Sequence, residues 1–174
     1  MAFEKKVDIP GNVTVTMDGT TLVVSGPKGT LKREMRYPQV SVDCDEETVL
    51  FATGSDRKRI VAMVGTYAAH TNNMFQGVTE GFEYRMKVVY SHFPIQLKVA
   101  GNRLEIINFL GEKEARYARI LDGVSVKLGN DEVTVSGIDK DAVGSTAANI
   151  ETATHIRKRD PRVFQDGIYV VEKV

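Results

Sequence analysis

The sequence has little of what several classes of protein require. It contains one cysteine, Cys44, among 174 residues, so no disulfide can form within the chain. Its three histidines are scattered at spacings that match no zinc motif, so neither a metal nor another cofactor is expected. No apolar run approaches the roughly 18 residues of a membrane-spanning helix, and the first residues lack the apolar stretch of a secretory signal. These absences predict a cytoplasmic protein in a reducing compartment, with no membrane partner.

The sequence also has no surplus of either charge. It carries 23 Lys and Arg residues against 23 Asp and Glu residues, with an isoelectric point near 6.8. The balance holds in both halves, with eleven of each sign in residues 1–90 and twelve of each in residues 91–174. The chain as a whole is therefore not an obvious polyanion binder, and any such binding requires a local cluster of cations.

An internal repeat organises the chain. An offset of 84 residues aligns Pro10 with Pro94, each of which begins a strand-like stretch (13–16 and 95–99), and it also aligns 40–42 with 124–126. The offset becomes 79 at residues 65–69 and 144–148, and 86 at residues 80–82 and 166–168. Because the matches occur in the same order, they predict two copies of one module, residues 1–90 and 91–174.

The two copies have the same order of predicted elements. Alternating apolar residues predict strands at 13–17, 21–25, 40–44 and 48–52, and again at 95–99, 103–107, 124–128 and 132–136. A helix follows in each copy, with Asp56 or Asp139 as its N-cap, and 82–90 or 167–173 forms the closing strand. Apolar stripes at helical spacing comprise Ile60, Val64, Tyr67, Thr71 and Met74 in one copy, and Val143, Ala147, Ile150 and Thr154 in the other. The predicted fold class is α+β, a tandem repeat in which each antiparallel sheet carries one α-helix.

The copies differ between the helix and the closing strand. The second copy has about seven additional residues around 156–162, of which four are cationic and one is acidic: Arg157, Lys158, Arg159 and Arg162, with Asp160. Arginine forks on a loop match phosphate oxygens, and a feature added to one copy of a scaffold is a candidate for function. A solvated charged loop at the end of a helix, where cations favour the helix dipole, is the other interpretation.

No residue pattern indicates an enzyme. Residues 25–29, Ser-Gly-Pro-Lys-Gly, lack the spacing and the Lys-Ser/Thr ending of a phosphate-binding P-loop, so a hairpin turn with an exposed Lys28 is expected. Cys44 alternates with valines on a strand and has no histidine near it in sequence, so no nucleophile–base pair is indicated. We therefore predict no catalytic residue among Cys44 and the three histidines.

Four stretches carry a resemblance to a known family. Residues 73–87 (NMFQGVTEGFEYRMK) and 90–94 (YSHFP) resemble the large-subunit ribosomal protein L-six family, in its archaeal and eukaryotic branch. Residues 159–170 (RDPRVFQDGIYV) look like the end of that family's sequence, and 25–29 look like its first-module loop. The resemblance covers nearly the whole chain.

The resemblance implies a structural constituent of the large ribosomal subunit that binds large-subunit (23S-type) rRNA through its second module. It places the protein near the factor-binding region at the stalk base, beside neighbouring ribosomal proteins and close to translation factors. The expected RNA contacts are then Arg157, Lys158, Arg159 and Arg162, together with the adjacent His155. Two alternatives stay open: a protein-binding adaptor of two repeated modules without RNA affinity, and an enzyme, which needs a cleft of converging titratable groups.

Overall fold

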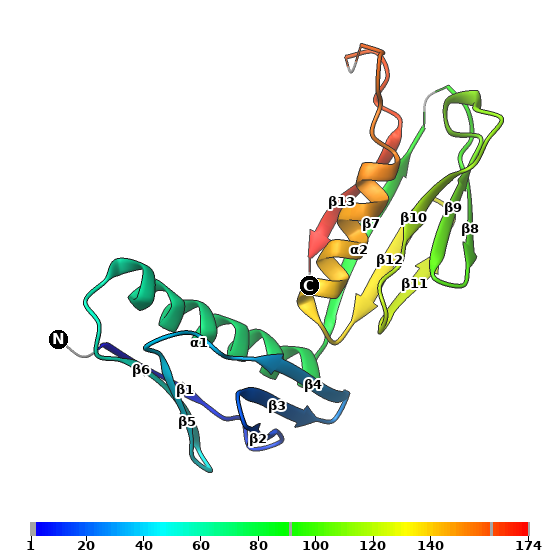
Figure 1. The fold of residues 1–174 in the computed structure, drawn as a ribbon. Coiled ribbons are helices and arrows are strands. Elements are labelled where there is room, and N and C mark those ends of the chain that lie inside the picture. The colour runs from blue at the N-terminus through cyan, green and yellow to red at the C-terminus, as the bar shows by residue number, and fades with distance from the viewer. Residues whose placement is uncertain (1–2, 91, 161, 174) are drawn as a thin grey trace. The chain divides into compact units, whose positions relative to one another are not determined.

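The computed structural model describes residues 3–90, 92–160 and 162–173. The chain forms two compact units that divide between Gly81 and Phe82. Each unit combines antiparallel strands with one α-helix, as Figure 1 shows.

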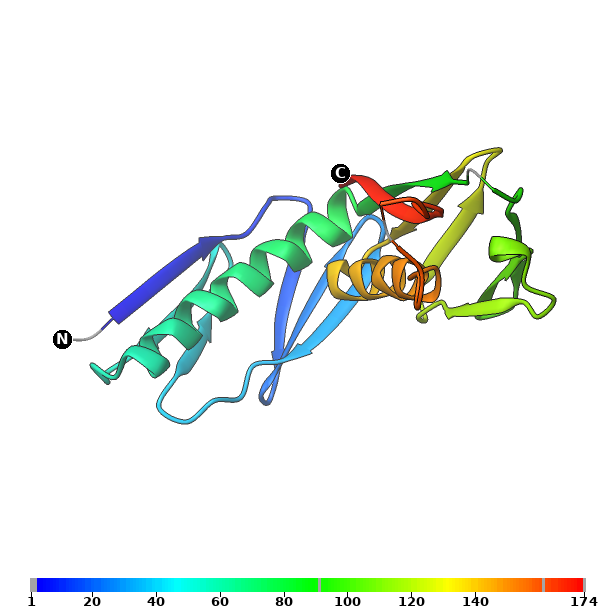
Figure 2. The same ribbon diagram turned by 90° about the horizontal axis from the view of Figure 1, so that it is seen from above.

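The first unit consists of two small sheets and a long helix. Strands β2 (Thr14–Asp18), β3 (Thr21–Gly26) and β4 (Gly29–Glu34) form a meander in that order. Strands β1 (Phe3–Asp8), β6 (Thr48–Thr53) and β5 (Ser41–Cys44) form the second sheet, with β6 in the middle. Helix α1 (Lys58–Thr79) runs along these strands, as Figure 2 shows.

The core of this unit follows from the alternation in its strands. Val49 and Phe51 of β6 are fully buried, as are Leu22 and Val24 of β3, while their neighbours in sequence are more exposed. The Phe51 ring lies 6.2 Å from the ring of Tyr67 on α1, a spacing typical of packed aromatic pairs. Each such side chain contributes roughly 1.5–3 kcal/mol on burial, so the apolar faces of sheet and helix hold the unit together.

The second unit has the same plan with one more strand. Strands β8 (Gln96–Ala100), β9 (Arg103–Ile107) and β10 (Arg116–Arg119) form a meander, with the short helix η1 (Phe109–Gly111) between β9 and β10. The second sheet has the order β11-β12-β7-β13, comprising β11 (Val124–Leu128), β12 (Glu132–Gly137), β7 (Phe82–Val89) and β13 (Gly167–Lys173). Helix α2 (Lys140–Ala153) packs against both sheets.

The order of elements shows how the units correspond. Strands β1 to β6 and helix α1 recur as β7 to β12 and α2, and β1 pairs with β6 as β7 pairs with β12. The α+β fold with two similar modules is thus confirmed. The strand at 82–90, expected to close the first module, instead lies between β12 and β13 as the first strand of the second unit. Strand β13 then has no counterpart among the described strands of the first unit.

The start of β7 follows from the way in which α1 ends. Helix α1 ends where the amides of Glu80 and Gly81 both donate to the carbonyl of Gln76, and Gly81 has a φ of +77°. Glycine adopts this left-handed conformation readily, so the helix ends here and β7 begins only two residues after α1. Every second residue of β7 is then buried, beginning with Phe82, in the core of the second unit.

Most of the local predictions are confirmed. All nine residues of the two predicted helical stripes are buried, and the Asp139 carboxylate caps α2 by accepting from the Asp141 amide at 2.9 Å. The cap proposed at Asp56 is wrong, because Arg57 is the N-cap of α1 and makes no side-chain capping bond. Residues 26–29 form the expected hairpin turn, in which Gly26 pairs with Gly29. Two strands, β1 and β10, were not predicted.

Candidate nucleic-acid interface

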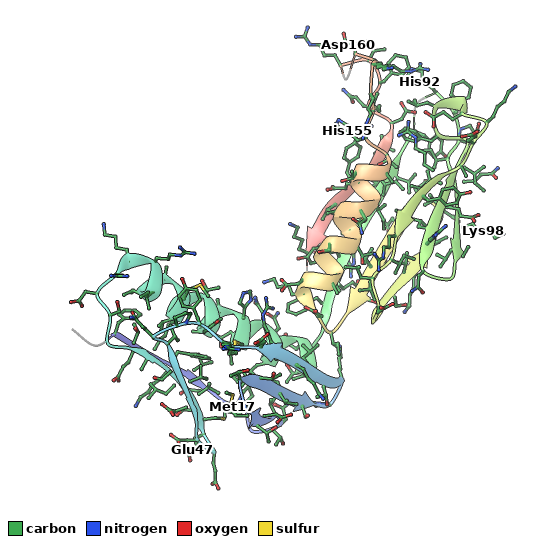
Figure 3. All side chains as sticks on the ribbon, in the orientation of Figure 1. Met17, Glu47, His92, Lys98, His155 and Asp160 are labelled. Atoms are coloured by element: carbon green, nitrogen blue, oxygen red, sulfur yellow. The ribbon has the colours of Figure 1, made fainter. Side chains whose placement is uncertain are left out.

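The predicted contact residues lie on one segment of the second unit. Residues 154–166 connect α2 to β13, and we call this segment the basic loop. Figure 3 shows His155 just beyond the end of α2 and Asp160 at the tip of the loop. All five predicted RNA contacts, His155, Arg157, Lys158, Arg159 and Arg162, are exposed. In the first unit only Glu80 and Gly81 separate α1 from the next strand, so the basic loop is an addition to the shared plan.

The start of the basic loop is fixed by a buried threonine. Thr154 is 3% exposed, and its hydroxyl accepts from the amide of Ile168 on β13 at 3.1 Å. The same hydroxyl lies 3.1 Å from the carbonyl of Glu151, to which it donates. The Glu151 side chain makes a second link, since its Oε1 accepts from the Val170 amide at 2.8 Å. These bonds tie the end of α2 to β13 on both sides of the loop.

The tip of the loop is a compact turn built on its acidic residue. The Asp160 carboxylate accepts from the Arg162 amide at 2.9 Å, and the Asp160 carbonyl accepts from the amides of Val163 and Phe164. Lys158 has a left-handed φ of +60°, which a lysine adopts only where the surrounding chain enforces it. The Asp160 carboxylate therefore organises the turn and forms no ion pair with a neighbouring cation in the described part of the loop.

The four cations of the loop have different surroundings. The Arg159 guanidinium carbon lies 4.7 Å from the centroid of the Phe164 ring, a cation–π contact. The side chains of Arg157, Lys158 and Arg162 have no hydrogen-bond or ion-pair partner among the residues that the structure describes. The sequence predicted all four cations as RNA contacts; in the structure three of them have no partner among the described residues, and Arg159 also packs on Phe164.

His92 and Asp166 hold Phe164 in place, and the sequence did not reveal this pair of residues. The His92 ring stacks on Phe164 with centroids 4.6 Å apart, and His92 Nδ1 lies 2.9 Å from an oxygen of Asp166. Asp166 is 1% exposed and also accepts from the His92 amide at 3.2 Å. The end of the basic loop is thus attached to the segment that follows β7.

Arg116 on β10 supports the beginning of the loop. Its Nη1 donates to the carbonyls of Ala153 and His155, at 3.0 and 3.1 Å, at the end of α2. Its other nitrogens form a two-pronged ion pair with Glu112, at 2.8 and 2.6 Å, and its guanidinium carbon lies 4.4 Å from the Phe109 ring centroid. The hydrogen bond from Arg116 lowers the pKa of the Glu112 carboxyl from its ordinary value, with smaller contributions from the charges of Arg116 and Arg159. The four-residue spacing of Glu112 and Arg116 was the available signal in the sequence.

A pocket of about 490 Å³ lies between the end of α2, the basic loop and β13. Its lining combines apolar, aromatic and polar side chains, among them Glu151, His155, Arg157, Phe164, Gln165 and Tyr169. Of the predicted contact residues it brings together His155 and Arg157, whereas Lys158, Arg159 and Arg162 lie outside it.

Other kinds of site find no support in the described residues. Within residues 3–90, 92–160 and 162–173, no three His, Cys, Asp or Glu side chains gather in a way that could hold a metal ion. Cys44 is half-buried; burial, and secondarily the charge of Asp45, raises the pKa of its thiol, which disfavours a nucleophilic thiolate. No helix in the described part of the chain is long and apolar enough to cross a membrane.

Comparison with known proteins gives a consistent result over the whole chain. The family model described as Ribosomal protein L6 matches residues 9–81 and, a second time, residues 93–167. A protein of Methanospirillum hungatei JF-1 named large ribosomal subunit protein uL6 is 62% identical over 173 residues, which cover 99% of this chain and 98% of the relative. Proteins of the same name from Methanothrix thermoacetophila and Methanococcus vannielii are 52% and 47% identical, over 97% and 98% of this chain and 96% and 94% of theirs.

Proposed function

The chain belongs to the ribosomal protein L6 family, and on that premise we propose that it is a structural, rRNA-binding constituent of the large ribosomal subunit. Its role is to hold a fixed set of cations against the phosphate backbone of large-subunit rRNA. No step of this role requires catalysis, a metal or another cofactor.

The basic loop carries this proposal. Arg157, Lys158 and Arg162 are exposed and unpaired within the described structure, and the nearby acid, Asp160, is engaged in the turn of the loop. Because the loop is tied to α2 and β13 at its ends, these cations need little reordering on binding, which lowers the entropic cost of association. Proteins recognise folded RNA largely through its backbone and shape, for which such cations are suited.

The finer placement follows from the family resemblance. We infer that the second unit faces rRNA near the factor-binding region at the stalk base, with ribosomal proteins as neighbours and translation factors close by, in the cytoplasm. Strand β13 and the basic loop, both lying beyond the shared plan, account for the RNA affinity of this unit.

The test is the salt dependence of binding to a transcript of archaeal large-subunit rRNA. Each phosphate neutralised adds roughly 0.7–0.9 to the slope of log affinity against log salt concentration. The triple variant Arg157→Gln, Lys158→Gln, Arg162→Gln is therefore expected to bind more weakly and to lower the slope by about 2–3. Its folding should change little, since exposed charges contribute little to stability.

A matched control removes three exposed cations from the first unit, as Lys5→Gln, Lys6→Gln, Lys58→Gln. This control should retain most of the affinity and slope. If it loses both while the basic-loop variant retains them, the anchor lies elsewhere. If the wild-type protein binds the transcript no better than an unrelated neutral protein does, the adaptor function replaces the RNA-binding one.

A further inference from the structure

The pocket beside the basic loop has an aromatic wall that is held in place. Tyr169 on β13 is 46% exposed, and its hydroxyl donates to the carbonyl of Gln165 at 3.1 Å. Its ring lies over Gly167 so closely that a Cβ at Gly167 would meet Cζ and the hydroxyl oxygen at 2.9 Å. Only a glycine at this position lets the ring occupy its observed place, so one end of the ring is anchored while nearly half of the side chain remains open.

The other aromatic residue of the pocket is already engaged. Phe164 contacts the His92 ring and the Arg159 guanidinium, with centroid distances of 4.6 and 4.7 Å. These contacts make Phe164 a support of the pocket and leave Tyr169 as the ring with surface for a ligand.

Hydrogen-bond donors and acceptors surround the Tyr169 ring. Arg157 is exposed at the pocket and continues the cationic surface of the basic loop, and the exposed His155 also lines the pocket. Glu151 uses Oε1 for the Val170 amide, and its Oε2 has no partner among the described residues. Gln165 adds a side-chain amide. A flat heteroaromatic ring with amino and carbonyl groups at its edge and a phosphate attached fits this combination.

We propose that the pocket binds one unpaired nucleotide of the RNA, with its base stacked on Tyr169 and its phosphate at Arg157. The proposal rests on the RNA-binding function and adds to it a contact with a base, whereas the loop cations contact only the backbone. The volume of the pocket, about 490 Å³, lies within the roughly 300–1,000 Å³ of small-molecule pockets. Unpaired bases of RNA commonly stack on aromatic side chains. The cationic rim favours a nucleotide over an uncharged or basic peptide segment.

The experiment combines two kinds of probing on a complex with an archaeal large-subunit rRNA transcript. Hydroxyl-radical cleavage reports contact with the RNA backbone, and base-selective chemical modification reports access to each base. With wild-type protein, we expect at least one unpaired base to be protected within the backbone footprint. Tyr169→Leu should abolish that base protection but keep the backbone footprint. It should also weaken binding about 5- to 100-fold, as expected for the loss of one stacked base, with an unchanged salt slope.

Three further variants make the result specific to the ring. Tyr169→Phe keeps the ring and should keep the base protection. Gly167→Ala displaces the ring and should lose the protection. Tyr117→Leu removes another exposed tyrosine of the same unit, 57% exposed on β10, and should change neither footprint nor affinity. Ultraviolet crosslinking of the wild-type complex, which needs no variant, should give an RNA adduct at Tyr169.

The outcomes separate this proposal from the function on which it rests. A backbone footprint in which no base protection depends on Tyr169, or crosslinks that omit Tyr169, overturns the nucleotide pocket alone. That result is expected if a segment of a neighbouring protein occupies the pocket. A wild-type protein that leaves no backbone footprint overturns the RNA-binding function, and the pocket proposal with it.

Discussion

Arg116 is predicted to hold the basic loop in its binding position. Its guanidinium joins three parts of the second unit: the carbonyls at the end of α2, the Glu112 carboxylate and the Phe109 ring. Replacing it as Arg116→Gln removes the charge and the fork geometry at once. The carbonyls of Ala153 and His155 then lose the donor that fixes the first residues of the loop.

The expected loss of stability can be worked from these contacts. Two hydrogen bonds to carbonyls that water can partly reach contribute about 1 kcal/mol each. The ion pair with Glu112 is partly exposed to water, since the two side chains are 25% and 42% exposed, and it contributes about 0.5 kcal/mol. The contact with the Phe109 ring contributes about 0.5–1 kcal/mol. The free energy of unfolding should therefore fall by about 3 kcal/mol in Arg116→Gln. In Arg116→Lys, which retains a charge but not the fork, it should fall by about 1–2 kcal/mol.

The effect on RNA binding distinguishes positioning from direct contact. Arg116 is paired with Glu112, so its loss should not remove a phosphate contact, and the salt slope should stay the same within about 0.5. The affinity should nonetheless fall roughly tenfold, because freeing even one loop residue costs about 1–2 kcal/mol of backbone entropy when the loop binds.

Urea unfolding and filter binding at several salt concentrations measure the two effects. The matched control is Arg119→Gln, an exposed arginine of the same strand, which should change stability by less than about 0.5 kcal/mol. If Arg116→Gln loses less than 1 kcal/mol, or if its salt slope falls with its affinity, Arg116 does not act by positioning the loop.

Two further predictions concern stability. The pKa of Glu112 is lowered in the folded protein, so its ion pair stabilises the fold above the ordinary value of 4.5 and loses this effect as the pH falls through the lower folded value. Glu112→Gln should therefore lower the free energy of unfolding by less than about 1 kcal/mol at pH 7 and leave it unchanged in strong acid. Urea unfolding across this pH range tests the prediction, and a loss of stability that is independent of pH contradicts it. Gly26→Ala should lower the free energy of unfolding by about 1–3 kcal/mol, because the added Cβ would meet Val78 Cγ2 at 2.6 Å. Gly65→Ala on α1 has open space around the added Cβ and should raise the free energy of unfolding by about 0.5–1 kcal/mol. Thermal unfolding that ranks the two variants in the opposite order refutes this reasoning.

The local elements of the fold could be predicted where their periodicity is strong. The stripes on α1 and α2 show in the sequence because one face of each helix is buried against a sheet. Strand β1 shows no such alternation, since its first four residues are all exposed, and β10 is only four residues long. The pairing of β7 with β12 and β13 was beyond prediction, because a strand of alternating residues does not specify its partners.

The residues of the candidate site likewise divide into those that the sequence indicated and those that it did not. The cations of the basic loop were found because one copy of the repeat has them and the other does not. The partners of Arg116 include main-chain carbonyls nearly forty residues away, and a carbonyl leaves no trace in the sequence. Tyr169 depends on a close approach to Gly167 that becomes visible only when the ring position is known. The sequence therefore indicated the candidate residues that carry charge, and it missed those whose proposed role depends on their geometry.

The balanced charge of the chain is consistent with a local anchor for a polyanion. Exposed charges are screened beyond about 8–10 Å at physiological salt, so RNA responds to the charges nearest to it and little to the total. At β7, Arg85 forms ion pairs with Glu83 and Glu172, both at 3.0 Å, so its cation is compensated locally. On the basic loop the acid is bound to a backbone amide, and three cations remain uncompensated within the described structure. Under the proposed function, the affinity of this surface for phosphate therefore comes from the arrangement of the partners and not from the number of charges.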